Sequence, residues 1–405
     1  MPQGQDSGEQ ALSNRQEFKI TWHKASLDIV GFVNQQQGQA LAKSTKFNGL
    51  GYSSLPFVAL VVMLITWNLK LPWFALVALG FLLVATVYVA VHHAEVVALR
   101  VGEPYGAFIL AVAVTVIEVG MIVVLILENP LGSENLARDT VFAAVMITTN
   151  GIVGSALLVK TLKNKVATFN SEGVSGALAL LAALAVLSLV LPAVTTSSPG
   201  QTFTPFQLGF AAVASLALYL VFVAAKTVRH RDFFLPVPKN DELPNVNAHV
   251  SPPSAKEAAF SFVALMASLV AVVGLAKITS PLIKDAVEVA GLPQAVVGVS
   301  IAVIVLLPEW ISAIRAAQYG RTQKSLNLAY GSALASIGLT IPVMAIISIV
   351  FGYQVNLGLG QTEIYLLFLT LIVSALTVLP GRANLMQAAV HLGIFASFLL
   401  VVVAP

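Results

Sequence analysis

Long apolar stretches separated by short polar segments run along most of the chain. Windows of about 20 largely apolar residues, the length an α-helix needs to cross a bilayer, recur from residue 54 onwards. We expect helices near residues 54–70, 72–95, 104–127, 140–160, 174–194, 205–226, 258–277, 292–316, 326–350, 362–379 and 384–404. The pattern predicts an all-α polytopic membrane protein with about 11 transmembrane helices.

The composition supports this fold class and narrows the chemistry. Hydrophobic residues make up 57% of the chain and charged residues 10%, whereas soluble domains have about 45–50% and about 25%. The net charge of +3 gives no reason to expect a nucleic-acid partner. The absence of cysteine excludes disulfides, thiolate metal sites and cysteine catalysis. We therefore expect a protein whose main partner is the lipid bilayer.

Polar segments divide the chain into five parts. Residues 1–53 are polar and Gln-rich without the features of a signal peptide, and we expect a cytosolic tail. Residues 54–71 hold an extra helix, and the proline-rich stretch 227–257 is typical of an extended cytosolic linker. The linker separates two groups of five helices, residues 72–226 and 258–405. Because five is odd, the two groups cross the membrane in opposite directions, as in the inverted repeats of secondary transporters.

The basic residues predict the direction of insertion. With the N-terminus in the cytoplasm, 18 of the 22 Lys and Arg residues fall in cytoplasmic segments and 4 fall outside. Loops retained in the cytoplasm are enriched in these residues. The sequence therefore predicts a multi-pass protein of the cell (inner) membrane with a cytoplasmic N-terminus and an external C-terminus.

Two glutamates interrupt long apolar stretches well away from their ends. Glu118 lies in the second helix of the first group, and Glu309 lies in the second helix of the other group. Charged groups inside a bilayer are costly and usually functional. An internal two-fold relation would bring both carboxylates together near the midplane, where we expect them to bind cations or protons. The simpler alternative is that each is a separate carboxyl group neutralised by its surroundings.

Small polar residues near the two glutamates supply further candidate oxygen ligands. Pro308 leaves the carbonyl of Ile304 without its helical donor beside Glu309. The candidate cation ligands are Thr115, Thr149, Asn150, Ser312, Ser332 and Ser336. Carboxylate, hydroxyl and carbonyl oxygens are the ligands of hard cations. Close helix packing is the alternative role for such small residues.

Two carboxylates also suggest how transport is coupled. An empty, doubly negative site is costly to carry through a low-dielectric barrier. One Ca²⁺, two protons, or one Na⁺ with one proton would each compensate much of that charge. If only compensated states change their direction of access, cation export is matched by proton entry. No resident cofactor is needed, because the cations are cargo.

Four stretches resemble those of a known family: HHAEVVALRVGEPYGAFILAVAVTVIE, LLPEWISAI, NLAYGSALASIGLTIPV and PGRANLMQAAVHLGIFA. They closely resemble the bacterial ChaA-type calcium/proton antiporters of the cation/Ca²⁺ exchanger superfamily, over roughly residues 54–405. The resemblance implies eleven spans, an inverted five-plus-five core, and Glu118 and Glu309 as the essential acids of the two repeat motifs. It also implies export of Ca²⁺, Na⁺ or K⁺ against protons.

Other polar residues have less definite roles. His92, His93, Glu95 and Glu103 lie at the cytoplasmic end of the second predicted helix and are candidates for proton or cation entry; an interfacial polar cap is the alternative. Asp139 suits the first turn of its helix. Arg382 and His391 belong to the last of the resembling stretches, but the sequence suggests no role for them beyond helix anchoring.

Competing functions have little support in the sequence. An intramembrane zinc protease would need two histidines one helical turn apart, but His92 and His93 are adjacent. A passive cation channel is the second alternative, although two acids in inverted repeats favour alternating access. Within the transporters, Na⁺(K⁺)/H⁺ exchange with little Ca²⁺ activity is the main alternative to Ca²⁺/H⁺ exchange.

Overall fold

The computed structural model describes residues 49–102, 105–128, 133–200, 202–235 and 253–405. Most of the predicted tail, most of the predicted linker and Glu103 lie outside these residues. The chain divides after Leu55 into two units, and apart from the first residues of α2 everything below concerns the second, Pro56–Pro405.

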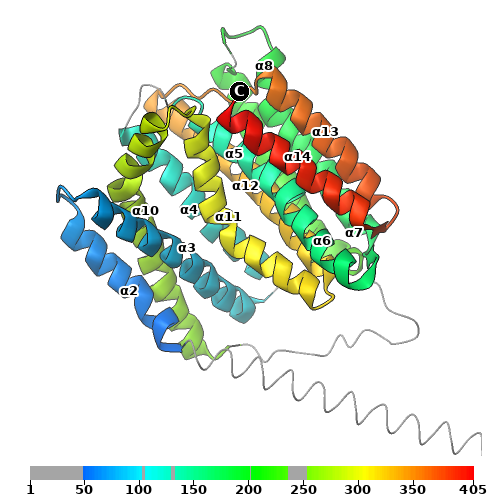
Figure 1. The fold of residues 1–405 in the computed structure, drawn as a ribbon, viewed down its shortest axis with the longest axis horizontal. Helices are drawn as coiled ribbons and strands as arrows, with labels where there is room; N and C mark the ends of the chain where they lie inside the picture. The colour runs from blue at the N-terminus through cyan, green and yellow to red at the C-terminus, as the bar shows by residue number, and fades with distance from the viewer. Residues whose placement is uncertain (1–48, 103–104, 129–132, 201, 236–252) are drawn as a thin grey trace, which may run out of the picture. The chain divides into compact units, whose positions relative to one another are not determined.

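The described residues are mainly helical, as predicted (Figure 1). The first half contains α2 (Gly49–Thr66), α3 (Trp73–Val101), α4 (Tyr105–Glu128), α5 (Leu136–Met146), the π-helix η1 (Ile147–Ile152), α6 (Val153–Asn164), β1 (Ala167–Thr168), α7 (Ser171–Ala185), the π-helix η2 (Val186–Val190), α8 (Leu191–Val194), α9 (Pro205–Ala224), the π-helix η3 (Ala225–Arg229) and the 3₁₀-helix η4 (Arg231–Phe234). The second half contains α10 (Ala255–Val289), α11 (Ala295–Gln318), α12 (Thr322–Phe351), α13 (Gln361–Val378), β2 (Arg382–Ala383) and α14 (Leu385–Val403).

Ten helical segments of the described chain are long and apolar enough to cross a membrane. Helix α2 is the eleventh apolar helix, and its apolar part, Ser53–Thr66, is shorter than the other ten. The structure thus confirms a polytopic α-helical membrane protein. Capping boxes define several helix starts: at α10, for example, Ser254 and Glu257 each accept a hydrogen bond from the other's backbone N–H.

Helix α10 is longer than the sequence predicted. The apolar window ends at residue 277, but the helix continues through Pro281 to Val289. Proline cannot donate to the carbonyl four residues earlier, which here belongs to Lys277. The hydroxyl of Ser280 donates to that carbonyl instead, at 3.1 Å. The carbonyl therefore keeps a hydrogen bond, and the helix continues.

The packing of the helices follows the inverted-repeat plan. The first helices of the two groups, α3 and α10, pack along each other. In the second group, the third helix, α12, packs on α9, the last helix of the first group. Reciprocally, the segment from α5 to α6, third in the first group, packs on α14, the last helix of the second (Figure 1). In each group, the third helix therefore packs against the last helix of the other group.

Loop contacts agree with the alternating crossing of the helices. Strands β1 and β2, which follow the predicted cytoplasmic ends of α6 and α13, pair antiparallel with Thr168 opposite Arg382. On the opposite side, the backbone N–H of Asn356 donates to the carbonyl of Glu134 at 3.0 Å. Segments predicted to share a side of the membrane therefore meet. Which side is cytoplasmic stays a prediction.

Candidate cation site

Both intramembrane glutamates are buried. Glu118 lies in α4 with 3% of its surface exposed, and Glu309 lies in α11 with 6% exposed. The two residues are close enough for their charges to interact. Two ionised carboxylates in this setting would be costly without compensation, because burial removes their hydration. The pair therefore suits a site that holds positive charge.

Helix α12 completes one side of this site. The hydroxyl of Ser336 donates to Oε1 of Glu118 at 2.7 Å. Thr340, one turn further along α12, is fully buried and lies close to the same carboxyl group. Glu118 belongs to the first repeat and α12 to the second, so this contact joins the two halves of the protein.

Glu309 has a different environment. Its Oε2 is buried and makes no hydrogen bond to the described residues. Pro308 precedes it within α11, so the carbonyl of Ile304 lacks its usual helical donor nearby. Ser312, one turn further on, is half-buried. A buried carboxylate oxygen without a hydrogen bond to the described residues can accept a cation or a proton.

The remaining candidate ligands lie in three helical segments, α4, α12 and η1. Thr115 is buried one turn before Glu118, and Ser332 is half-buried one turn before Ser336. Thr149 and Asn150 lie in η1, where both are fully buried. The Thr149 hydroxyl donates to the carbonyl of Val145 in its own helix. These four residues stay candidates for the site.

Asn150 makes side-chain hydrogen bonds to α13 and α14 as well as to the neighbouring Thr149. Its Nδ2 donates to Thr370 Oγ1 at 3.0 Å, and its Oδ1 lies 3.1 Å from Nδ1 of His391. The sequence did not predict this network, because nothing in the local pattern relates residues 150, 370 and 391. Only the packing of three distant helices brings them together.

Three of the predicted entry residues, His92, His93 and Glu95, lie in the last part of α3. Glu95 is solvent-exposed, yet it is near enough to both Lys324 and Glu309 for their charges to interact. His93 is buried, His92 is half-buried, and their rings lie 5.7 Å apart. The exposed carboxylate of Glu95 is therefore electrostatically linked to the buried one of Glu309.

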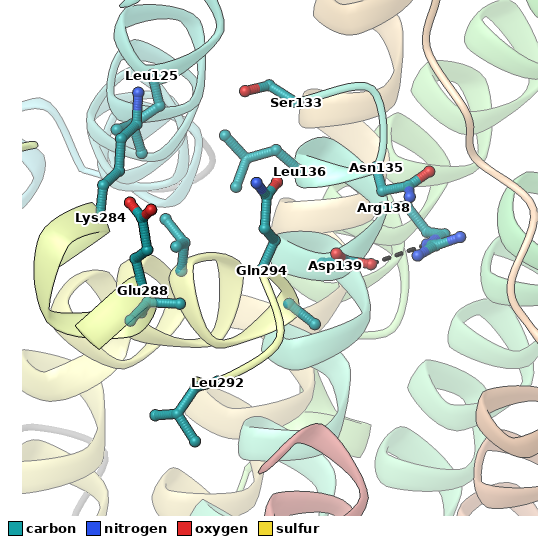
Figure 2. A pocket seen from close by; sticks show the side chains of 13 residues that line it. Leu125, Ser133, Asn135, Leu136, Arg138, Asp139, Lys284, Glu288, Leu292 and Gln294 are labelled. Carbon is teal, nitrogen blue, oxygen red and sulfur yellow. Dashed lines mark hydrogen bonds and ion pairs between the residues drawn. The ribbon is translucent and has the colours of Figure 1, made fainter. Parts of the chain in front are cut away.

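A separate cavity of about 620 Å³ opens between the ends of α4, α5, α10 and α11 (Figure 2). Glu288 and Lys284 line one wall, and Asp139 and Arg138 line another. Asp139 accepts from Arg138 Nε at 2.8 Å, and Arg138 Nη1 donates to the carbonyl of Gly358 at 3.1 Å. Asp139 is thus paired with Arg138. By the predicted topology, this cavity is on the external side.

Within the described residues, no three or more His, Asp or Glu side chains form a group that could hold a metal ion. A cation bound between Glu118 and Glu309 would therefore take its other ligands from hydroxyl or carbonyl oxygens or from water. Ca²⁺ accepts six to eight such oxygens in flexible geometry.

Comparison with known proteins decides the family. The sequence profile of the sodium/calcium exchanger protein family matches residues 70–228 and 260–404. The chain belongs to the sodium/calcium exchanger family. It is accordingly a multi-pass membrane protein and a secondary transporter rather than an enzyme.

Individual relatives agree with this assignment. The chain is 47% identical over 328 residues to "Putative ionic transporter y4hA" of Sinorhizobium fredii, covering 80% of this chain and 87% of the relative. It is 30% identical over 353 residues to the sodium-potassium/proton antiporter ChaA of Escherichia coli, covering 86% and 95%. Both similarities extend over at least 80% of this chain.

Solved structures confirm the fold. Native YfkE matches with a TM-score of 0.67 and 18% identity, covering 87% of this chain and 100% of that chain. The H⁺/Ca²⁺ exchanger CAX matches with a TM-score of 0.66 and 17% identity, covering 88% of each. At these identities the likeness concerns the exchanger fold alone.

Proposed function

We propose that this exchanger is a cation/proton antiporter that exports Ca²⁺ in exchange for H⁺ by alternating access. The observation that carries the proposal is the pair of buried carboxylates, Glu118 and Glu309, at equivalent places in the two repeats. The hydrogen bond from Ser336 to Glu118 supports it, since it stabilises the ionised form that a cation needs.

Charge compensation couples the two ions. With Ca²⁺ bound, the doubly negative site is neutral, and with two protons bound it is neutral again. The empty, ionised site carries a desolvation penalty of several kcal/mol per charge, so it changes its direction of access much more slowly. Ca²⁺ therefore leaves in one direction only when protons, or another compensating cation, return in the other.

The path to the site follows from the same charges. We assign Glu95, His92 and His93 to the cytoplasmic entry, because Glu95 is exposed and interacts electrostatically with Glu309. The cavity at Asp139 and Glu288 is assigned to the external side. This orientation rests on the distribution of Lys and Arg residues, which favours a cytoplasmic N-terminus for this inner-membrane protein.

Exchange of Na⁺ or K⁺ for H⁺ with little Ca²⁺ activity is the second candidate. The similarity to a sodium-potassium/proton antiporter favours it. One Na⁺ with one proton would neutralise the same two carboxylates. The two candidates therefore share one site and one coupling rule and differ in the preferred cation.

Proton flux in proteoliposomes tests the proposal. An acid-inside gradient is imposed, and Ca²⁺, Na⁺ or K⁺ is added separately outside while a pH-sensitive dye reports the gradient. Dissipation by micromolar Ca²⁺, with Na⁺ acting only at millimolar concentration, is the expected result. A response to Na⁺ or K⁺ alone would overturn the Ca²⁺ assignment, and no response to any of the three would overturn antiport itself.

A further inference from the structure

A second buried polar cluster contains neither glutamate. It joins η1 to α13 and α14 through Asn150, Thr370, Thr377 and His391, all of them buried. His391 Nδ1 lies 3.1 Å from Asn150 Oδ1, and its Nε2 lies 3.1 Å from Thr377 Oγ1. The other end of the Asn150 amide donates to Thr370 Oγ1. The cluster thus ties three membrane helices together.

The hydrogen bonds determine which nitrogen of His391 carries the proton. An amide oxygen can only accept, so Nδ1 of His391 donates to Asn150. The Nε2 atom then accepts from the hydroxyl of Thr377. Both hydrogen bonds are satisfied by an uncharged imidazole. They fix the ring of His391 between η1 and α13.

The element that it holds is an unusual one. A π-helical turn is rare and is often found at functional sites. In η1 the turn places Asn150 against His391, and the next residue, Gly151, faces both Trp310 of α11 and Phe395 of α14. A Cβ on Gly151 would lie only 3.2 Å from the ring of Trp310, which directly follows Glu309. The π-helical turn is therefore in close contact with the segment that carries the second acid.

A second contact strengthens this connection. Trp310 Nε1 donates to Ser155 Oγ at 2.9 Å, and its ring packs edge-on against Phe395 of α14 at 5.6 Å. On the same helix as Ser155, a Cβ on Gly154 would come within 3.1 Å of His391 Cβ. Helix α14 therefore packs against η1 and α6, and these in turn pack against the part of α11 that carries Glu309.

We infer that His391 is a positioning residue for cation binding. Through its hydrogen bond to Asn150, it holds η1 against α11 and so sets the place of Glu309 in the site. This inference rests on the proposed antiport and adds a residue that touches neither carboxylate. Loss of the hydrogen bond loosens the site and weakens cation binding more than it slows the maximal rate.

Two substitutions of similar polarity separate this role from simple packing. The side-chain nitrogen of asparagine takes the place of histidine Nδ1, whereas that of glutamine takes the place of Nε2. His391→Asn therefore keeps a donor for Asn150, and His391→Gln does not. We expect half-saturating Ca²⁺ or Na⁺ to stay near wild type in His391→Asn and to rise roughly tenfold in His391→Gln, as for one lost buried hydrogen bond. The maximal rate should change less than about twofold if binding, not turnover, is affected.

Ser397→Ala is the matched control on α14, because Ser397 is exposed and its hydroxyl donates to the carbonyl of Gly393 in its own helix. The inference would be overturned if the half-saturating cation concentration were equal in the two His391 variants. It would also be overturned if the variants gave a lower protein yield with an unchanged half-saturating concentration. If His391→Gln fails to insert, Thr377→Val removes the hydroxyl that bonds to His391 Nε2 and helps to fix the ring, and unchanged half-saturation there also overturns the inference.

The wild-type protein separates this inference from the proposed function. Without cation-driven proton flux in the wild type, the antiport proposal fails, and the positioning role fails with it. With normal flux in the wild type and in every variant, antiport stands and only the role of His391 is lost.

Discussion

Replacing Ser336 by alanine removes a single hydroxyl that links the two repeats. That hydroxyl donates to Oε1 of Glu118 at 2.7 Å, and Ser336 is 4% exposed. Alanine keeps the helix and most of the packing of α12, because only one oxygen atom is lost. The change therefore tests the hydrogen bond with little effect on the fold.

The magnitude follows from the charge of the acceptor. A hydrogen bond to a charged group contributes about 1.5–3 kcal/mol, and about 1.4 kcal/mol corresponds to a factor of ten in binding. The hydroxyl stabilises the ionised carboxylate, which is the form that binds a cation. Without it, protons compete more effectively for Glu118. We expect half-saturating Ca²⁺ to rise by about tenfold to a hundredfold, and less at alkaline pH, where fewer protons compete.

The assay is the Ca²⁺ dependence of proton flux in proteoliposomes at two external pH values. Ser268→Ala is the matched control, because Ser268 is also fully buried but donates only to the carbonyl of Ala264 in its own helix. Equal half-saturation for the two variants would refute the reasoning. So would a loss in Ser336→Ala that does not shrink as the pH rises.

Three further predictions can be tested with the same preparation. Glu118→Gln and Glu309→Gln should each abolish exchange while membrane insertion, followed by size-exclusion chromatography in detergent, stays normal; full activity in either variant would remove that residue from the site. Deletion of residues 1–45 should leave transport largely unchanged, and an inactive truncation would contradict the interpretation of this segment as an accessory tail. Gly298→Ala should lower stability by about 1–3 kcal/mol, because a Cβ would lie 2.9 Å from Asp139 Cβ; an unchanged thermal transition would show that α5 and α11 can separate at little cost.

The positions of the two acids were predictable because membranes penalise isolated charge. Glu118 and Glu309 stand out as carboxylates in the middle of apolar stretches, and their equivalent places in two groups of five helices follow from counting spans. Ser336 was a candidate for a weaker reason, as one of several small polar residues whose oxygen atoms could bind a cation. Its actual partner, Glu118, depends on how α4 and α12 pack.

Other features had no signal in the sequence. The turn at Ile147–Ile152 contains Thr149 and Asn150, which the sequence marked as candidate ligands, but nothing in the pattern predicts a π-helix there, and its neighbour His391 lies more than two hundred residues away. The end of α10 was predicted too early, because the hydroxyl contact from Ser280 to the Lys277 carbonyl compensates for Pro281. The local pattern of apolar residues predicts the approximate extent of the membrane-spanning segments. It does not predict which polar atoms form hydrogen bonds with one another.

The sequence by itself determined that this chain crosses a membrane many times. It also predicted two groups of helices of opposite direction, each with one glutamate deep inside an apolar stretch. These properties depend on the free energy of transferring each side chain from water to lipid. That free energy is a property of the residue and does not depend on the fold. Only the tertiary structure decided that Ser336 meets Glu118, that Glu309 Oε2 is left without a hydrogen bond among the described residues, and that His391 holds Asn150. Those relations join helices far apart in the chain, so they depend on how the helices pack and not on the pattern along any one of them.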